Sequence, residues 1–332
     1  MQKTPYLLFL GDAADTLAAK VALGIRQWRP RDCVGQLRLA GCNADAGLPD
    51  LSITEARKAS AQTLVVGVAN RGGVIADNWV EVLINAVESG MDVAAGLHNK
   101  LADVQSLKEA ADRHGRQLFD VRHPAQSFAV GSGKKRSGKR LLPVGTDCSC
   151  GKMYTALALE KEMLSRDMKA DFRATGQTGI LIAGSGVSVD AVVADFISGA
   201  VETLAPANEA DHWDLIEGQG SLFHPSFAGV TMGLIHGAQP DALVLCHEPT
   251  REHMRGLPEY PIPDVEDCMD AHVRAARLTN SNAEFVGVCV NTSALQAGGA
   301  RRYLDEVEER VRLPAVDPVR DGVGRVVDQL IG

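Results

Sequence analysis

Short apolar runs alternate with amphipathic stretches along the whole chain, an order that predicts parallel β-sheets joined by crossover helices. In the first part, the expected strands are residues 6–10, 63–68, 92–97 and 117–121, and the expected helices are residues 13–28, 79–89 and 104–114. This order indicates an α/β fold with a Rossmann-like domain over residues 1–130, although the GxGxxG signature of dinucleotide-binding members is absent.

A second α/β series occupies residues 141–332 and predicts another parallel-sheet domain. Its expected strands are 141–144, 171–175, 213–216, 242–246 and 285–290, and its expected helices are 152–166, 189–203, 268–278, 301–311 and 322–331. Residues 131–140 join the two series, and half of them are basic while the others are Gly or Ser. This composition favours a solvated interdomain linker. The alternative is a basic strip beside an anionic ligand.

The motif with the clearest chemistry lies between the strand at 141–144 and the helix at 152–166. It consists of Gly145, Thr146, Asp147, Cys148, Ser149, Cys150, Gly151 and Lys152. Glycines at both ends let successive amide N–H groups face inward, while the helix N-terminus and the lysine add positive charge. The order of strand, glycine, Gly-Lys and helix therefore predicts a phosphate-binding loop that makes the second domain a P-loop domain. The alternative is a glycine-rich turn with an incidental lysine.

One position departs from the usual P-loop. Met153 stands where a Ser or Thr hydroxyl normally reaches Mg²⁺, and a thioether cannot replace that hard oxygen ligand. Thr155, two positions further on, does not inherit the required geometry. The loop therefore favours a ligand that keeps its phosphates during the reaction, such as coenzyme A, and we expect no metal.

Candidate catalytic residues follow the strand at 213–216. Glu217 enters a glycine-rich turn at the end of this strand, where an acid holds Mg²⁺ or a reacting proton. His224 comes just beyond the turn and has the chemistry of a general base near neutral pH. The alternatives are a turn carboxylate and a structural histidine.

The two loop cysteines admit three interpretations. Loop amides would lower the pKa of Cys148 or Cys150, so that a thiolate could attack a thioester and form an acyl-enzyme. Metal binding is disfavoured by the CxC spacing, since no matching ligand pair accompanies it. Packing of small residues within the loop is the interpretation we favour.

The first part of the chain carries cations after two of its strands. Arg71 follows the strand at 63–68, and Arg122 follows the strand at 117–121. The carboxyl ends of parallel strands bind ligands, and an arginine there can hold a carboxylate with two hydrogen bonds. Both residues are candidates for an anionic substrate, with ordinary surface loops as the alternative.

Composition narrows the classes of function. The chain has 332 residues with a formal net charge of −8, which argues against a general nucleic-acid-binding surface. Apolar runs such as residues 242–246 are far shorter than the roughly 20 residues of a membrane span. Seven scattered cysteines do not suggest a disulfide framework, and no export signal is evident. We therefore expect a cytoplasmic protein without membrane or nucleic-acid partners.

The motifs also resemble known families. Gly145-Thr146-Asp147 with Gly151-Lys152, and Glu217-Gly218-Gln219-Gly220 on a later strand, resemble dethiobiotin synthetase and its P-loop relatives. The pattern Gly-Thr-Asp-Cys-x-x-Gly-Lys-Met, following a Rossmann-like domain, is closer to the DgcN-type family. That resemblance covers essentially the whole chain. It implies a D-glutamate N-acetyltransferase that uses acetyl-CoA and works beside an N-acetyl-glutamate racemase of the enolase superfamily in D-amino-acid catabolism.

This resemblance leads to a working hypothesis of direct acyl transfer. Residues 145–153 would hold acetyl-CoA, Glu217 or His224 would deprotonate the amine of D-glutamate, and Arg71 and Arg122 would bind its carboxylates. A homo-oligomer is compatible with this hypothesis. The alternatives are an ATP- and Mg²⁺-dependent carboxylate–amine ligase or kinase like dethiobiotin synthetase, and a non-catalytic nucleotide-binding regulatory protein.

Overall fold

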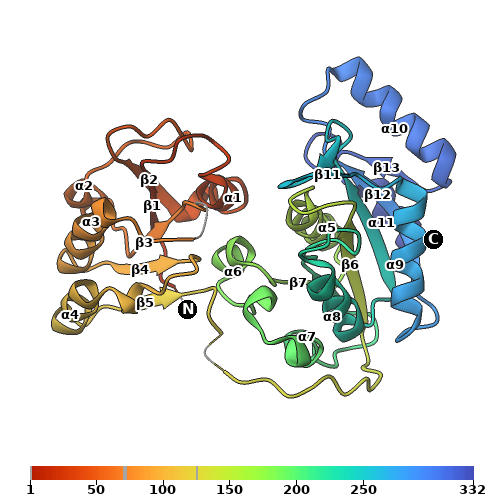
Figure 1. Ribbon diagram of the computed structural model, residues 1–332, viewed down its shortest axis with the longest axis horizontal. Helices are drawn as coiled ribbons and strands as arrows, with labels where there is room; N and C mark the ends of the chain where they lie inside the picture. Colours follow the sequence, from red (N-terminus) through yellow and green to blue (C-terminus); the bar gives the residue numbers. More distant parts are fainter. Residues whose placement is uncertain (1, 70–72, 125) are drawn as a thin grey trace. The chain divides into compact units, whose positions relative to one another are not determined.

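The computed structural model describes residues 2–69, 73–124 and 126–332 of the chain. The chain divides into two compact units (Figure 1). The first comprises residues 1–125 and 177–191, and the second comprises residues 126–176 and 192–332. The units are therefore not consecutive stretches of chain, as the ranges 1–130 and 141–332 would require, because residues 177–191 return to the first unit.

The first unit is built on a parallel sheet with the strand order β2-β1-β3-β4-β5. The strands are β1 (Tyr6–Gly11), β2 (Cys33–Arg38), β3 (Thr63–Val66), β4 (Asp92–Ala95) and β5 (Leu118–Asp120). Every residue of β1, β3 and β4 is buried, which explains the apolar runs that these strands form, in β3 and β4 after the polar first residues Thr63 and Asp92.

Helices cover both faces of this sheet. They are α1 (Lys20–Trp28), α2 (Ile53–Lys58), α3 (Asp77–Glu88) and α4 (Gln105–His114), with short 3₁₀ helices at Pro30–Asp32 and Leu101–Asp103. Figure 1 shows α2, α3 and α4 on one face and α1 on the other. Helix α6 (Gln177–Ala183), from the returning segment, packs against α1.

Two expectations for this unit were wrong. The helix expected at 13–28 begins only at Lys20, because Ala13 closes a turn onto the Leu10 carbonyl and the Asp15 carboxylate accepts a hydrogen bond from the Ala18 amide. Strand β2 was not expected at all. It lies at the edge of the sheet and is only partly buried, so its residues show no continuous apolar run.

The second unit has a parallel sheet with the order β13-β12-β9-β6-β8-β7. Its strands are β6 (Lys139–Gly145), β7 (Ala170–Arg173), β8 (Trp213–Ile216), β9 (Ala242–His247), β12 (Glu284–Val290) and β13 (Ala315–Val316). An antiparallel hairpin of β10 (His253–Met254) and β11 (Leu257–Pro261) follows β9. Strand β6 therefore lies in the middle of the sheet, between β9 and β8.

The helices of this unit are α5 (Lys152–Ser165), α7 (Ile197–Leu204), α8 (Ala228–Ala238), α9 (Val265–Arg277), α10 (Ala297–Val311) and α11 (Gly324–Ile331). Helix α8 packs against both α7 and α9, while α5 packs against α11. The single helix expected at 189–203 was wrong. This range holds two short 3₁₀ helices, Val189–Ala191 and Ala194–Phe196, before α7 begins.

The basic segment at 131–140 is only partly a solvated linker. Lys134 and Lys135 are exposed, but β6 already begins at Lys139 and Arg140 is fully buried. Arg136 donates to the carbonyls of Ala205 and Ala238, at the C-terminal ends of α7 and α8, where a cation is favourable. The guanidinium of Arg136 is thus bound to the protein itself.

Pro143 is accommodated in this central strand because the paired stretch of β6 and β8 ends before it. The pairing of β6 with β8 ends at Leu141, two residues before the proline. Beyond that point Gly218 approaches the Pro143 carbonyl so closely that a Cβ on Gly218 would lie 1.8 Å from the oxygen. The missing N–H of Pro143 therefore interrupts no pairing with β8.

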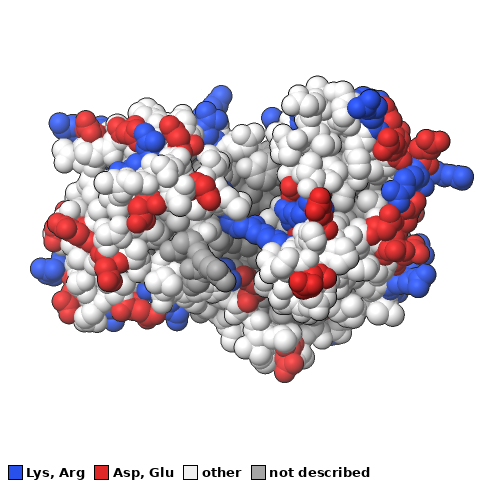
Figure 2. Space-filling model, turned by 45° about the horizontal axis from the view of Figure 1, so that its top comes forward, with Lys and Arg blue, Asp and Glu red and all other residues white. Residues whose placement is uncertain are grey.

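The surface carries charges of both signs. Figure 2 shows acidic and basic side chains interspersed over the face that it displays, without a broad area of basic residues alone. Within the described residues, no helix has both the length and the apolar character needed to cross a membrane.

Candidate active site

The loop between β6 and α5 leaves a row of amide donors unused. Its chain turns through left-handed conformations at Ser149, with φ of 54°, and at Gly151, with φ of 111°. Apart from the turn at Cys148 and Ser149, the described residues offer no hydrogen-bond acceptor to the amide N–H groups of 147–152, and no side chain caps α5. Successive free N–H groups at a helix N-terminus form an anion-binding site.

Lys152 lies inside this loop. Its side chain is 6% exposed, and its Nζ donates to the Asp147 carbonyl at 2.7 Å. Burial opposes the charged form, but the acidic groups around it, Cys150 foremost and Asp147 among them, raise the pKa of Lys152 above its ordinary value. A Cβ at Gly145 would lie 3.1 Å from Nζ and 2.5 Å from the Cys150 sulfur, so the loop is closely fitted around the ammonium group.

The side chains after Met153 do not restore a magnesium ligand. Thr155 is buried, and its hydroxyl accepts a hydrogen bond from the Cys246 thiol at 3.3 Å. The hydroxyl therefore faces the core beneath the loop, against Cys246 of β9. Met153 itself offers only a thioether.

Two arginines that the sequence analysis missed hold the outside of the loop. Arg251 donates to the Asp147 Oδ2 at 2.5 Å and to the Cys148 carbonyl at 2.6 Å. The Arg255 amide donates to the same Oδ2 at 2.9 Å, and its Nη1 donates to the Ser149 hydroxyl at 2.6 Å. Arg251 therefore fixes both a side chain and a peptide carbonyl of the loop.

The sequence does contain a feature that could have pointed to these two arginines. They lie in the highly charged segment 247–255, which begins at the carboxyl end of β9, and β9 is the strand next to β6. The sequence pattern predicted β9 but not its place beside the loop strand.

Glu217 stands at the end of β8, the other neighbour of β6. Its Oε2 accepts hydrogen bonds from the amides of Thr175 and Gly176, each at 2.9 Å. A Cβ on the next residue, Gly218, would lie 3.0 Å from the Cδ of Lys152. The structure therefore brings the turn that begins at Glu217 against the loop lysine.

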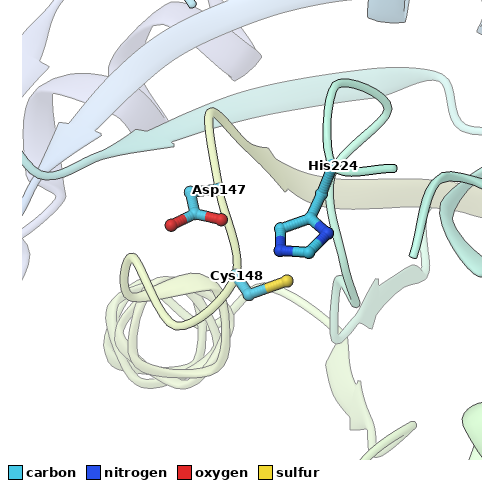
Figure 3. A group of neighbouring side chains, drawn as sticks. All are labelled: Asp147, Cys148 and His224. Atoms are coloured by element: carbon cyan, nitrogen blue, oxygen red, sulfur yellow. The ribbon is translucent and has the colours of Figure 1, made fainter. Parts of the chain in front are cut away.

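His224 lies beside Asp147 and Cys148 (Figure 3), and one donor atom from each of these three residues lies within 4.8 Å of the others. The His224 Nδ1 accepts from the Ser226 amide, and its Nε2 donates to the Arg255 carbonyl, both at 3.2 Å. Oxygen, sulfur and nitrogen donors suit Zn²⁺. A metal would first have to displace a hydrogen bond of His224.

The two loop cysteines lie in a packed environment. Burial, opposed by the nearby Lys152, raises the pKa of Cys148 to about 11. Cys150 is 1% exposed, and its thiol donates to the Asp147 carbonyl at 3.1 Å. These contacts favour the packing interpretation of both cysteines over a thiolate nucleophile.

The substrate-binding candidates belong to the first unit. Arg122 forms an ion pair with Asp190 and donates to the Gln177 side chain at 3.5 Å. Both partners come from the returning segment 177–191, which sequence reasoning had assigned to the other domain. Arg71 lies outside the described residues.

Two buried histidines make stability depend on pH. His247 hydrogen-bonds the Thr146 hydroxyl at 3.0 Å, and His272 lies within α9. Burial lowers the pKa of each to about 4, from about 6.5 when unfolded. Between these values the unfolded chain binds more protons, so the free energy of unfolding should fall as the pH drops from 6.5 to 4.

Urea unfolding at a series of pH values measures this dependence. The variant His272→Phe keeps a ring in the core and removes one titrating group, so we expect a shallower loss of stability in acid. An unchanged slope in this variant would contradict the contribution assigned to His272.

Comparisons with known proteins agree with this architecture. Residues 37–124 match the Rossmann-like domain DUF1611_N, and residues 127–327 match the P-loop domain of DUF1611, both described as domains of unknown function. A crystal structure of a DUF1611 family protein from Anabaena variabilis has a TM-score of 0.88 and 31% identity, covering 99% of both chains. The predicted fold class is confirmed.

Two curated relatives span almost the full chain. A protein of Tritonibacter scottomollicae is 58% identical over 330 residues, and one of a Pseudoalteromonas species is 51% identical over 328 residues. The alignment covers 99% of each chain in both cases. Both relatives are named D-glutamate N-acetyltransferase.

Proposed function

This chain belongs to the DUF1611 family, and we propose that it is a D-glutamate N-acetyltransferase whose acetyl donor is acetyl-CoA. The main support for acetyl-CoA as the donor is the phosphate loop. It combines free amides within residues 147–152 with the buried cation of Lys152. Met153 and the inward-facing Thr155 supply no hydroxyl for Mg²⁺. A donor that keeps its phosphates during the reaction needs no such ligand.

The residues of the loop fit a diphosphate group. Its negative charge would be bound by the amides, the N-terminal end of α5 and the Lys152 ammonium. The expected cofactor-binding set is the loop from Gly145 to Met153, with no metal.

The transfer requires a deprotonated amine. The nitrogen of D-glutamate attacks the thioester carbonyl, the C–S bond breaks, and the coenzyme A thiolate leaves and takes up a proton. We propose Glu217 as the base that receives the proton from the ammonium group, because it is a carboxylate at the end of β8 and the turn that it begins lies against Lys152. Amides of the turn 218–221 would stabilise the oxyanion of the tetrahedral intermediate.

The contacts support a different role for His224. Since both of its ring nitrogens already take part in hydrogen bonds, it is better suited to holding the segment around Arg255 than to accepting a proton.

Arg122 and Arg71 are the proposed ligands of the D-glutamate carboxylates, and of these two only Arg122 lies within the described residues. The product, N-acetyl-D-glutamate, would pass to an N-acetyl-glutamate racemase of the enolase superfamily in cytoplasmic D-amino-acid catabolism. A homo-oligomer fits this proposal, which includes no membrane or nucleic-acid partner.

Mass spectrometry of the purified protein with acetyl-CoA tests the activity. We expect N-acetyl-D-glutamate from D-glutamate, with a rate that changes less than twofold after dialysis against EDTA. Free coenzyme A should appear only after the amino acid is added, because the transfer is direct. Substrate-dependent ADP formation with ATP and Mg²⁺ would instead support a ligase, and binding without turnover would support a regulatory protein.

A further inference from the structure

The hairpin of β10 and β11 is fixed to the phosphate loop through one residue at its turn. The Arg255 amide donates to the Asp147 carboxylate at 2.9 Å, and the Arg255 carbonyl accepts a hydrogen bond from His224 at 3.2 Å. Asp147 and His224 thus bind both the amide and the carbonyl of Arg255. Its guanidinium reaches the loop, where Nη1 donates to the Ser149 hydroxyl at 2.6 Å.

The cations around the loop differ in what balances their charge. Lys152 is buried inside the loop, and Arg251 forms ion pairs with Asp147 and Glu248. Arg255 is exposed, and within the described part of the chain its side chain makes no ion pair with a carboxylate. A guanidinium fixed at the rim of an anion-binding loop without a counter-ion is suited to a second anionic group of the ligand.

We propose that Arg255 binds the 3′-phosphate of coenzyme A. This proposal rests on the function proposed above and assigns the part of the donor that the loop leaves unbound. Coenzyme A carries a diphosphate and, on its ribose, a separate phosphate monoester. The loop amides and Lys152 account for the diphosphate, while the planar guanidinium can bind the monoester through two parallel hydrogen bonds.

This assignment also explains why His224 and Asp147 hydrogen-bond the backbone of Arg255. Together they bind the amide and the carbonyl of Arg255, so its guanidinium stands at the loop before the ligand arrives. His224 is therefore a positioning residue for the cofactor.

Calorimetric titration with coenzyme A and with 3′-dephospho-coenzyme A tests the assignment. For the wild type, we expect the dephospho compound to bind roughly 10- to 100-fold more weakly, the range for hydrogen bonds to a charged group. In Arg255→Ala, coenzyme A should lose the same factor, whereas the dephospho compound should bind as it does to the wild type. The variant would then no longer distinguish the two ligands.

Arg274→Ala is the matched control, because it removes one arginine from the same unit at a position that is 81% exposed on α9. It should keep the wild-type ratio of the two affinities. If Arg255→Ala also keeps that ratio, the assignment of Arg255 is overturned while the proposed function stands. If neither compound binds to the wild type, both proposals are overturned.

Discussion

Replacing Lys152 with alanine should weaken the binding of coenzyme A roughly 100-fold, as expected when a cation that bonds to a phosphate group is lost. Lys152 is the cation enclosed by the loop, and its Nζ also donates to the Asp147 carbonyl. Its removal takes away the charge that balances the diphosphate and one contact that shapes the loop. Calorimetric titration measures the dissociation constant, and the rate of N-acetyl-D-glutamate formation should fall at least as far.

Lys161→Ala provides the control, because Lys161 is an exposed residue of the same helix, α5. It removes an equal charge without touching the loop and should leave affinity and rate within about twofold of the wild type. Unchanged affinity in Lys152→Ala would remove the loop from the binding site, whatever activity the protein retained.

The second large effect is expected at Gly218. A Cβ at this position would lie 1.8 Å from the Pro143 carbonyl oxygen and 3.0 Å from the Cδ of Lys152. Because the first contact is with backbone in the central strand, it cannot be relieved by moving a side chain. Gly218→Ala should therefore destabilise the protein by about 3 kcal/mol or more, which lowers the melting temperature by roughly 6 to 12 °C.

Gly229→Ala is the matched comparison. Gly229 is an exposed residue of α8, and a Cβ there would meet nothing within 4 Å. Alanine should raise stability by up to about 1 kcal/mol, because it favours the helix more than glycine does. Thermal unfolding followed by circular dichroism compares the two variants. Equal melting temperatures would show that the chain after β8 can move away from Pro143.

The sequence by itself determined the local elements with strong patterns. Fully buried parallel strands such as β1 and β9 are almost entirely apolar runs, so their positions could be read directly. The phosphate loop could be predicted too, since all its parts are consecutive in the chain. The edge strand β2 and the broken helical region before α7 were missed, because partial burial and turns leave no simple period.

Tertiary structure decided which distant residues share the site. Arg251 and Arg255 reach the loop only because β9 pairs with β6, and strand order is a property of the folded sheet. Segment 177–191 joins the first unit, where Asp190 pairs with Arg122, although the pattern gave no sign of its return. Local sequence encodes the conformation of each element through burial and backbone preference. Long-range pairing arises when the elements pack, and this pairing placed the arginines around the loop.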